Sequence, residues 1–304
     1  MADESGKKTG VRTRLYRLTI AVLLLVGAGG LLYPLVSAAW NAYREQRLIS
    51  SYSETVKKLD DRRNREIWED ALAYNRQHRV NAPADAFGKE KEADLPHPYA
   101  DLLNPNGDGV IGYIEIPKIA LSIPIGHGTG PDVLERGCGH LEGTSLPTGG
   151  TGNHTVLSAH RGLPGAKLFT DLDQIREGDR FYLHILDKVL AYQTDQILTV
   201  LPDETEALAI DPEEDYATLV TCTPYAVNTH RLLVRGHRIP YEVKQEKTDR
   251  RQNRNPFERL GMTERIFLAG VAALALIALV MFVIYRMTVR RGRKRNGGQR
   301  GKRL

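Results

Sequence analysis

Cysteine is scarce in this chain of 304 residues, which contains only Cys138 and Cys222. A protein held together by a framework of disulfides needs several pairs, so the count excludes that class of protein. A single bridge between the two residues is an alternative, but we expect two free thiols. Cys138 stands between glycines in RGCGHLEG, where we expect a small packed side chain.

A glycine-rich phosphate-binding motif and a complete set of metal ligands are also missing. Cys138 and His140 are close in sequence, but no second pair accompanies them, and zinc takes four ligands. Residues 104–115 match the spacing of a calcium-binding EF-hand loop. They begin with Asn and run into YIEIP, a strand pattern, whereas an EF-hand continues as a helix. We therefore expect neither a metal nor another cofactor.

Charge is absent from two long windows, residues 18–40 and 266–285. Each is long enough to cross a hydrocarbon core of about 30 Å, so we expect two transmembrane helices. Val36-Ser37-Ala38 resembles a signal-peptidase site, which makes a removed signal peptide the alternative for the first window. Its length, beyond the ~15 residues of a signal core, and Trp40 at an interfacial position favour a retained anchor.

Basic residues flank both windows. Five basic and two acidic residues precede Leu18, whereas nine basic and no acidic residues follow Tyr285. Positively charged flanks stay in the cytoplasm. We therefore expect both termini inside, and the segment between the spans outside the cell membrane. Because the basic tail starts directly after an apolar window, we interpret it as membrane-associated and expect no nucleic-acid partner.

The outer segment has a helical part and a strand-rich part. Apolar residues recur at helical spacing, which predicts two helices or one broken helix. These residues are Leu48, Tyr52, Val56 and Leu59, followed by Ile67, Trp68, Ala71 and Tyr74. Residues 81–98 lack periodicity and are interpreted as a loop. From Gly109 onward, seven β-branched stretches alternate with turn signals, and the only helical insert expected is residues 166–175. This pattern favours an antiparallel barrel or sandwich.

The clearest chemical pattern is TLVTCTPYAVNTHRLLVRGHR, residues 218–238. Cys222 ends an apolar strand and Arg231 opens the returning strand, so we expect the two side chains side by side. A nearby cation favours the thiolate, and an arginine stabilises an acyl oxygen that becomes negative. The hairpin alone leaves a second interpretation open, namely a buried cysteine beside a surface arginine.

A nucleophilic thiol also needs an imidazole. His160 is the best candidate because it ends the strand 155–159 and enters a loop, where rigid scaffolds hold reactive groups. His230 points to the opposite face of its strand from Arg231. His237 lies about 20 Å farther along the strand, and His184 lies in the middle of another strand.

The pattern from Thr218 to Arg231 closely resembles the Thr-Leu-x-Thr-Cys…Arg signature of sortases. Together with NHTVLSAHRG and GDGVIGYIEIPKI, it is similar to class C, the pilus-assembling sortases, from about residue 99 to 240. The resemblance implies a mainly β fold, a closed eight-stranded barrel with an N-terminal helical extension, flanked by two transmembrane helices. It also implies that His160, Cys222 and Arg231 are the catalytic residues of a cysteine transpeptidase. Such enzymes cleave LPXTG-like sorting signals between Thr and Gly and pass the acyl group to an amine.

Class C sortases also carry a lid with an Asp-Pro-aromatic motif, and this chain offers Asp85-Ala86-Phe87. The resemblance implies that Asp85 lies against Arg231 and Phe87 over Cys222. Proline would fix the backbone φ angle, so Ala86 should make the lid less rigid. An ordinary loop is the alternative.

The expected partners are pilins that carry LPXTG-like signals and the lipid bilayer, and the resemblance also allows a cell-wall precursor. A hydrolytic cysteine peptidase and a non-catalytic, membrane-anchored adhesin or receptor barrel are the alternative functions. We expect the following order along the chain: basic cytoplasmic N-terminus 1–17, span 18–40, helical extension and lid loop 41–98, barrel 99–245, juxtamembrane linker 246–265, span 266–285 and basic cytoplasmic tail 286–304.

Overall fold

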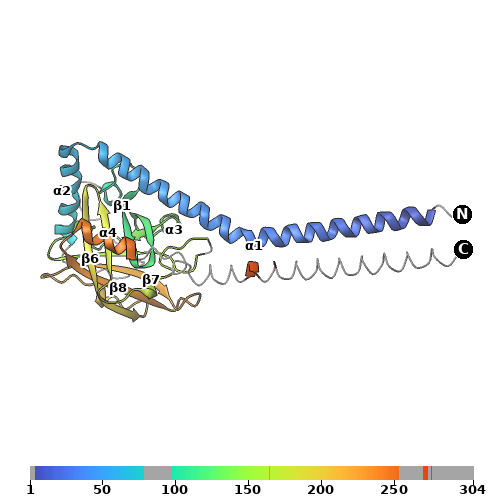
Figure 1. The fold of residues 1–304 in the computed structure, drawn as a ribbon. Coiled ribbons are helices and arrows are strands. Elements are labelled where there is room, and N and C mark those ends of the chain that lie inside the picture. The colour runs from blue at the N-terminus through green and yellow to red at the C-terminus, as the bar shows by residue number, and fades with distance from the viewer. Residues whose placement is uncertain (1–3, 79–97, 164, 253–269, 273–274, 276–304) are drawn as a thin grey trace, which may run out of the picture. The chain divides into compact units, whose positions relative to one another are not determined.

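A computed structural model describes most of the chain (Figure 1). The described residues are 4–78, 98–163, 165–252, 270–272 and 275. The chain divides into two compact units, residues 33–255 and residues 1–32 with 256–304. The first of these units contains the whole β-barrel.

Two helices form the N-terminal part, α1 (Glu4–Lys58) and α2 (Asp61–His78). The sequence left open two helices or one broken helix, and the structure has two. Asp60 lies between them. Its carboxylate accepts a hydrogen bond from the backbone N–H of Arg63 (2.7 Å), and this contact caps the N-terminus of α2. Tyr52 attaches α1 to the barrel because its hydroxyl donates to Ile111 O (3.0 Å) and accepts from Leu186 N (2.7 Å).

The first expected membrane span, residues 18–40, is part of α1. Among the residues that the structure describes, no helix combines the length and the apolar character needed to cross a membrane. The second expected span, residues 266–285, lies outside the described residues except for 270–272 and 275.

Eight strands close into a barrel in the order β1-β2-β3-β4-β7-β8-β6-β5. All seven strands expected from the sequence are present. Most neighbours are antiparallel, but β2 pairs with β3, and β4 with β7, in parallel. The strands are β1 (Val110–Ile116), β2 (Leu121–His127), β3 (Cys138–His140), β4 (Asn153–Ser158), β5 (Arg180–Ile185), β6 (Lys188–Val200), β7 (Asp215–Thr223) and β8 (His230–Ile239).

The strand that sequence patterns missed is β3, which has three residues and a central glycine. β3 pairs only with the end of β4. The segment that follows β3 forms backbone hydrogen bonds with more of β4. Leu141 N donates to Val156 O (2.9 Å), and Ser145 N donates to His154 O (3.1 Å). The outer edge of β4 is therefore occupied beyond β3 as well.

Alternate residues of the strands face inward and form the core. Fully burying one such aliphatic side chain contributes about 1.5–3 kcal/mol relative to leaving it exposed. The innermost residues, none of them accessible to solvent, include Ile111, Ile114, Ile116, Ile123, Ile125, Leu157, Leu183 and Leu219. Ile67, Ala71 and Tyr74 of α2 join the same cluster, so the helical extension is part of the core.

The α-helix expected over residues 166–175 is absent. Turns and a three-residue 3-10 helix, η3 (Leu172–Gln174), take its place. Leu168 has a φ of 39°, in the left-handed region, which interrupts a right-handed helix. The apolar residues Leu168, Phe169 and Leu172 are fully buried, so their pattern reflects loop burial rather than a helix face.

The remaining elements are short. The strand expected after residues 104–109, in place of the helix of an EF-hand, is confirmed as β1. Asn104 and Asp108 side chains accept hydrogen bonds from Gly109 N and Val110 N (both 3.1 Å) and so hold the turn before it. The short elements are η1 (Tyr99–Asp101), η2 (Pro117–Ile119), α3 (Pro131–Leu134), η4 (Glu206–Leu208) and α4 (Val243–Gln252).

Candidate functional site

The hairpin of β7 and β8 brings Cys222 and Arg231 together. The two residues are direct partners in the antiparallel ladder. Directly opposed residues hold their Cβ atoms about 4.5–5.5 Å apart on one face of a sheet. Both side chains are half-buried, and the connecting loop, residues 224–229, is exposed. The thiol and the guanidinium therefore lie side by side at a rim of the barrel, as the sequence predicts.

His160 reaches the same rim because β4 and β7 are parallel. Ala159 N donates to Val220 O (3.1 Å), and Thr221 Oγ1 donates to Ala159 O (2.8 Å), so the end of β4 is held beside the end of β7. His160 follows Ala159, just beyond the end of β4, and Cys222 follows Thr221 in β7. The strand pairing thus places all three catalytic candidates at one rim.

Arg161, which was not predicted from the sequence, connects the loop that follows β4 and contains His160 to strand β7, which carries Cys222. Its guanidinium donates to Thr223 Oγ1 (3.0 Å) and Thr170 O (3.2 Å), and forms a short ion pair with Asp173. Only 7% of the Arg161 side chain is exposed. These contacts join the neighbour of His160 to the neighbour of Cys222. The arginine that follows the histidine in AHRG was the only sequence signal for it.

The two loops also touch each other at a glycine. Gly162 has a φ of 76°, and a Cβ there would lie 2.8 Å from the ring of Tyr225. Both the left-handed backbone and the close ring require glycine at this position. The loop after His160 and the loop after Cys222 therefore pack directly against one another.

Cys138 does not take part in this arrangement. Both cysteines are free thiols, as expected, and Cys138 is fully buried with its Sγ 3.5 Å from Pro124 O. Burial raises the pKa of the Cys138 thiol far above its usual value, so this thiol stays protonated. The small packed role expected for Cys138 is confirmed.

The proposed lid residues Asp85, Ala86 and Phe87 lie outside the described residues. The three groups at the rim nevertheless suffice for one type of chemistry. A thiol, an imidazole and a guanidinium at a half-exposed strand end supply a nucleophile, a proton carrier and a donor to an oxyanion. That combination suits acyl transfer.

Comparisons with known proteins agree with this geometry. The family model of the sortase domain matches residues 114–239. Sortase A of Streptococcus agalactiae serotype III (strain NEM316) is 36% identical over 129 residues, which cover 41% of this chain and 51% of that protein. The chain thus spans about half the length of this relative.

Solved sortase structures are similar over most of their own length. Sortase C from Streptococcus pneumoniae is 50% identical, with a TM-score of 0.59, covering 64% of this chain and 97% of that one. A lid mutant of sortase A from Corynebacterium diphtheriae is 41% identical, with a TM-score of 0.57, covering 62% of this chain and 100% of that one. The chain therefore belongs to the sortases, a family of cysteine transpeptidases, and within that family to class C.

Proposed function

We propose that this protein cleaves LPXTG-like sorting signals between Thr and Gly and joins the acyl group to a lysine amine of a pilin, which polymerises pili. The observation that carries the proposal is the convergence of Cys222, Arg231 and His160 at one rim of the barrel. Sortase C of S. pneumoniae, which is 50% identical, has pilin substrates. That relative supports the choice of substrate class.

Each catalytic candidate has a distinct task in this reaction. The Cys222 thiolate attacks the threonine carbonyl carbon, and Arg231 donates to the oxygen that becomes negative. His160 gives a proton to the departing glycine amine as the C–N bond breaks, which leaves a thioester on Sγ. A lysine amine then attacks the thioester and loses a proton to His160, and Cys222 leaves as thiolate.

Hydrolysis uses the same three groups, with water in place of the lysine amine. A non-catalytic adhesin barrel would not need a thiol, an imidazole and a guanidinium at one rim. Product analysis by mass spectrometry, with and without a pilin-derived amine, distinguishes a transpeptidase from a hydrolase. An amide product in the presence of the amine supports transpeptidation, and the free acid alone supports hydrolysis.

We also propose that the protein is anchored in the cell membrane with both termini in the cytoplasm. Sortases are generally membrane-associated proteins of Gram-positive bacteria. Residues 18–40 and 266–285 contain no charged residue, and basic residues follow the second window directly. The barrel would then face outward, toward pilins and cell-wall precursors.

Replacing the nucleophile should abolish the reaction. We expect Cys222→Ala to form no acyl-enzyme with a sorting peptide, since no other described thiol lies at the rim. His160→Ala should lower kcat by about 10²–10⁴-fold. Arg231→Lys should not restore activity, because an ammonium lacks the planar fork of donors. Intact-protein mass spectrometry and product formation measure these effects.

Cys138→Ala is the matched control, because it removes the other, buried thiol. We expect it to form the acyl-enzyme at nearly the parental rate. Transpeptidation by Cys222→Ala would refute the assignment of the nucleophile.

Removing the Arg161 guanidinium should misplace His160 relative to Cys222. We expect Arg161→Ala to lower kcat about tenfold, or ~1.4 kcal/mol, with a smaller change in KM. It should also shift the pH profile of Cys222 alkylation, because the imidazole no longer sits in a fixed place beside the thiol. Arg161→Lys should recover only part of the activity.

Arg176→Ala is the control for this effect. Arg176 donates to Asp173 O and Ile175 O on the same loop but does not bond to β7. A lower melting temperature of Arg161→Ala with unchanged kcat and an unchanged pH profile would limit Arg161 to a structural role.

We propose the lid on residues 85–87 from the sequence. The similar C. diphtheriae protein is described as a lid mutant, which supports a lid in this chain as well. Burying an aromatic ring contributes roughly 1.5–3 kcal/mol, more than an exposed ion pair at about 0–1 kcal/mol. We therefore expect Phe87→Ala to speed the reaction of Cys222 with a bulky thiol reagent about tenfold. Asp85→Ala should speed it less, and Ala86→Pro should slow it. Equal rates in all four proteins would make residues 85–87 an ordinary loop.

The topology can be checked on intact cells. A protease added from outside should digest the segment between the two windows and spare both basic tails. Fragments are identified with antibodies against each terminus. External cleavage within residues 290–304 would contradict the proposed orientation.

A further inference from the structure

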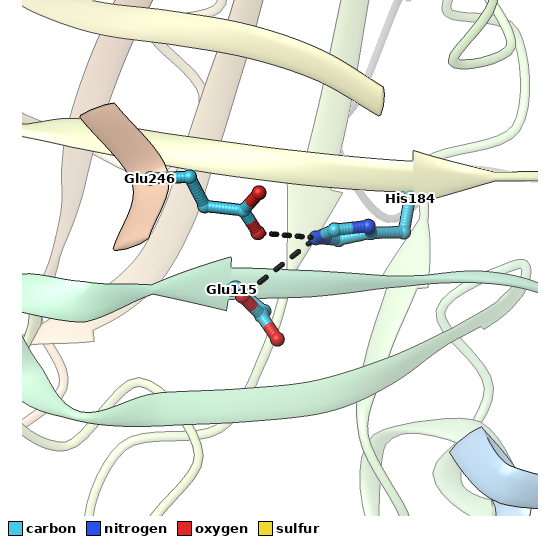
Figure 2. A group of neighbouring side chains, drawn as sticks. All are labelled: Glu115, His184 and Glu246. Atoms are coloured by element: carbon cyan, nitrogen blue, oxygen red, sulfur yellow. Dashed lines mark ion pairs between the residues drawn. The ribbon is translucent and has the colours of Figure 1, made fainter. Parts of the chain in front are cut away.

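A second polar cluster lies on the side of the barrel opposite the candidate active site. Glu115 of β1, His184 of β5 and Glu246 of α4 point toward one another (Figure 2). In the closed strand order, β1 is three steps from β4, and β5 is three steps from β7. The cluster is therefore separate from the rim that holds Cys222.

His184 is aimed at both carboxylates. Its Nε2 lies 3.5 Å from Glu246 Oε1 and 3.7 Å from Glu115 Oε2. Tyr113 stacks on the imidazole at 4.3 Å with an interplanar angle of 4°, which fixes the ring. The residue is only 8% exposed, and Nε2 has no hydrogen-bond partner among the described residues. Leaving a buried polar atom unsatisfied costs about 1–3 kcal/mol, so a ligand is indicated.

Arg250 of α4 places a positive charge on the same two oxygens. Its Nη2 donates to Glu246 Oε1 (2.5 Å) and lies 2.6 Å from Glu115 Oε2. The second contact lacks hydrogen-bond geometry, so within the described part of the chain Glu115 Oε2 also has no hydrogen bond. The Arg250 side chain is 49% exposed and has solvent beside it to move into. The cluster thus already holds a cation, and its half-exposed side chain could move into solvent if another cation took its place.

Glu246 is oriented by its hydrogen bonds. The Tyr241 hydroxyl donates to Glu246 Oε2 (2.5 Å) and leaves Oε1 facing His184. One carboxylate oxygen is thus held in place by a neighbour while the other is directed into the cluster.

The separations suit a small metal ion. Tetrahedral zinc with bonds of about 2.0–2.2 Å separates its ligand atoms by about 3.4 Å. The imidazole nitrogen lies 3.5 and 3.7 Å from the two oxygens, and all three atoms lie within 4.8 Å of one another. One imidazole with two carboxylates fits zinc and its first-row neighbours, whereas calcium takes about 6–8 oxygen ligands.

We propose that Glu115, His184 and Glu246 form a site for a divalent transition-metal ion of the Zn²⁺ class, which binds in exchange for the Arg250 guanidinium. The ion would bond to Glu115 Oε2, Glu246 Oε1 and His184 Nε2, with water in the fourth position. It would join α4 directly to β1 and β5. This revises the sequence-based expectation that the chain holds no metal, and it does not depend on the proposed transpeptidase reaction.

The test measures Zn²⁺ binding by calorimetry on the full chain in detergent. All proteins carry Cys222→Ala, because the thiol and imidazole of the active site would bind zinc themselves. We expect one Zn²⁺ per chain, and Co²⁺ in its place should give the intense visible absorption of a tetrahedral site. His184→Ala should weaken binding more than about 100-fold, since losing even an outer partner of a ligand costs 10–100-fold.

Arg250→Ala is the informative variant, because it removes the competing cation. We expect it to bind Zn²⁺ roughly tenfold more tightly, whereas a mere loss of folding would weaken binding. His237→Ala removes an imidazole of β8 outside the cluster and should leave affinity unchanged. His184→Gln and Arg250→Gln repeat both tests with side chains that preserve packing, and thermal melting confirms that each variant is folded.

Three results would overturn the proposal: no saturable binding by the parent, equal affinity in the parent and both His184 variants, or no gain in either Arg250 variant. Equal affinity in all variants would mean that the protein binds Zn²⁺ only adventitiously at its surface.

Discussion

The parallel pairing of β4 with β7 is the constraint on which the candidate active site depends. Parallel neighbours end at the same edge of a sheet, so the residues after both strands emerge together. Parallel strands also need a long crossover, which β5 and β6 supply here while they complete the barrel. Strand β8 then returns from that edge, antiparallel to β7. As a result, His160 reaches the same rim as Cys222 and Arg231 of the β7–β8 hairpin.

The rim is reinforced by contacts between its loops. Arg161 bonds to the end of β7, and Gly162 lies against Tyr225. Well-evolved sites hold reactive groups in place with such supporting contacts. The opposite side of the barrel is built differently, because α4 covers β1 and β5 mainly through charged and hydroxyl groups. Tyr182 and Arg180 both contact Asp249 there, beside the cluster around His184.

Local patterns in the sequence were sufficient for much of this fold. Seven strands follow from β-branched runs, but β3 is too short to show alternation. Residues 166–175 have an apolar spacing that suggests a helix, yet the backbone of Leu168 prevents one. The hairpin predicts the proximity of Cys222 and Arg231 because both residues are local to it.

Contacts between residues that are far apart in the sequence could not be predicted from local patterns. The position of His160 beside Cys222 depends on which strands are neighbours, and here the resemblance to sortases supplied what spacing does not. The contacts of Arg161 require the folded loop. Glu115, His184 and Glu246 are each separated by more than 60 residues in the sequence, so a search for closely spaced ligands misses them.

The coverage of β4 and β7 has a consequence for how a peptide is recognised. Many proteins bind extended peptides by strand addition, in which the peptide pairs with a free sheet edge and its backbone supplies much of the affinity. Strand β7, which carries Cys222, lies between β4 and β8, and the other side of β4 is occupied by β3 and the segment from Leu141 to Ser145. No unpaired edge is available next to the thiol among these described strands. An extended peptide that reached Cys222 would therefore have to bind to side chains and loops instead of adding a strand to the barrel.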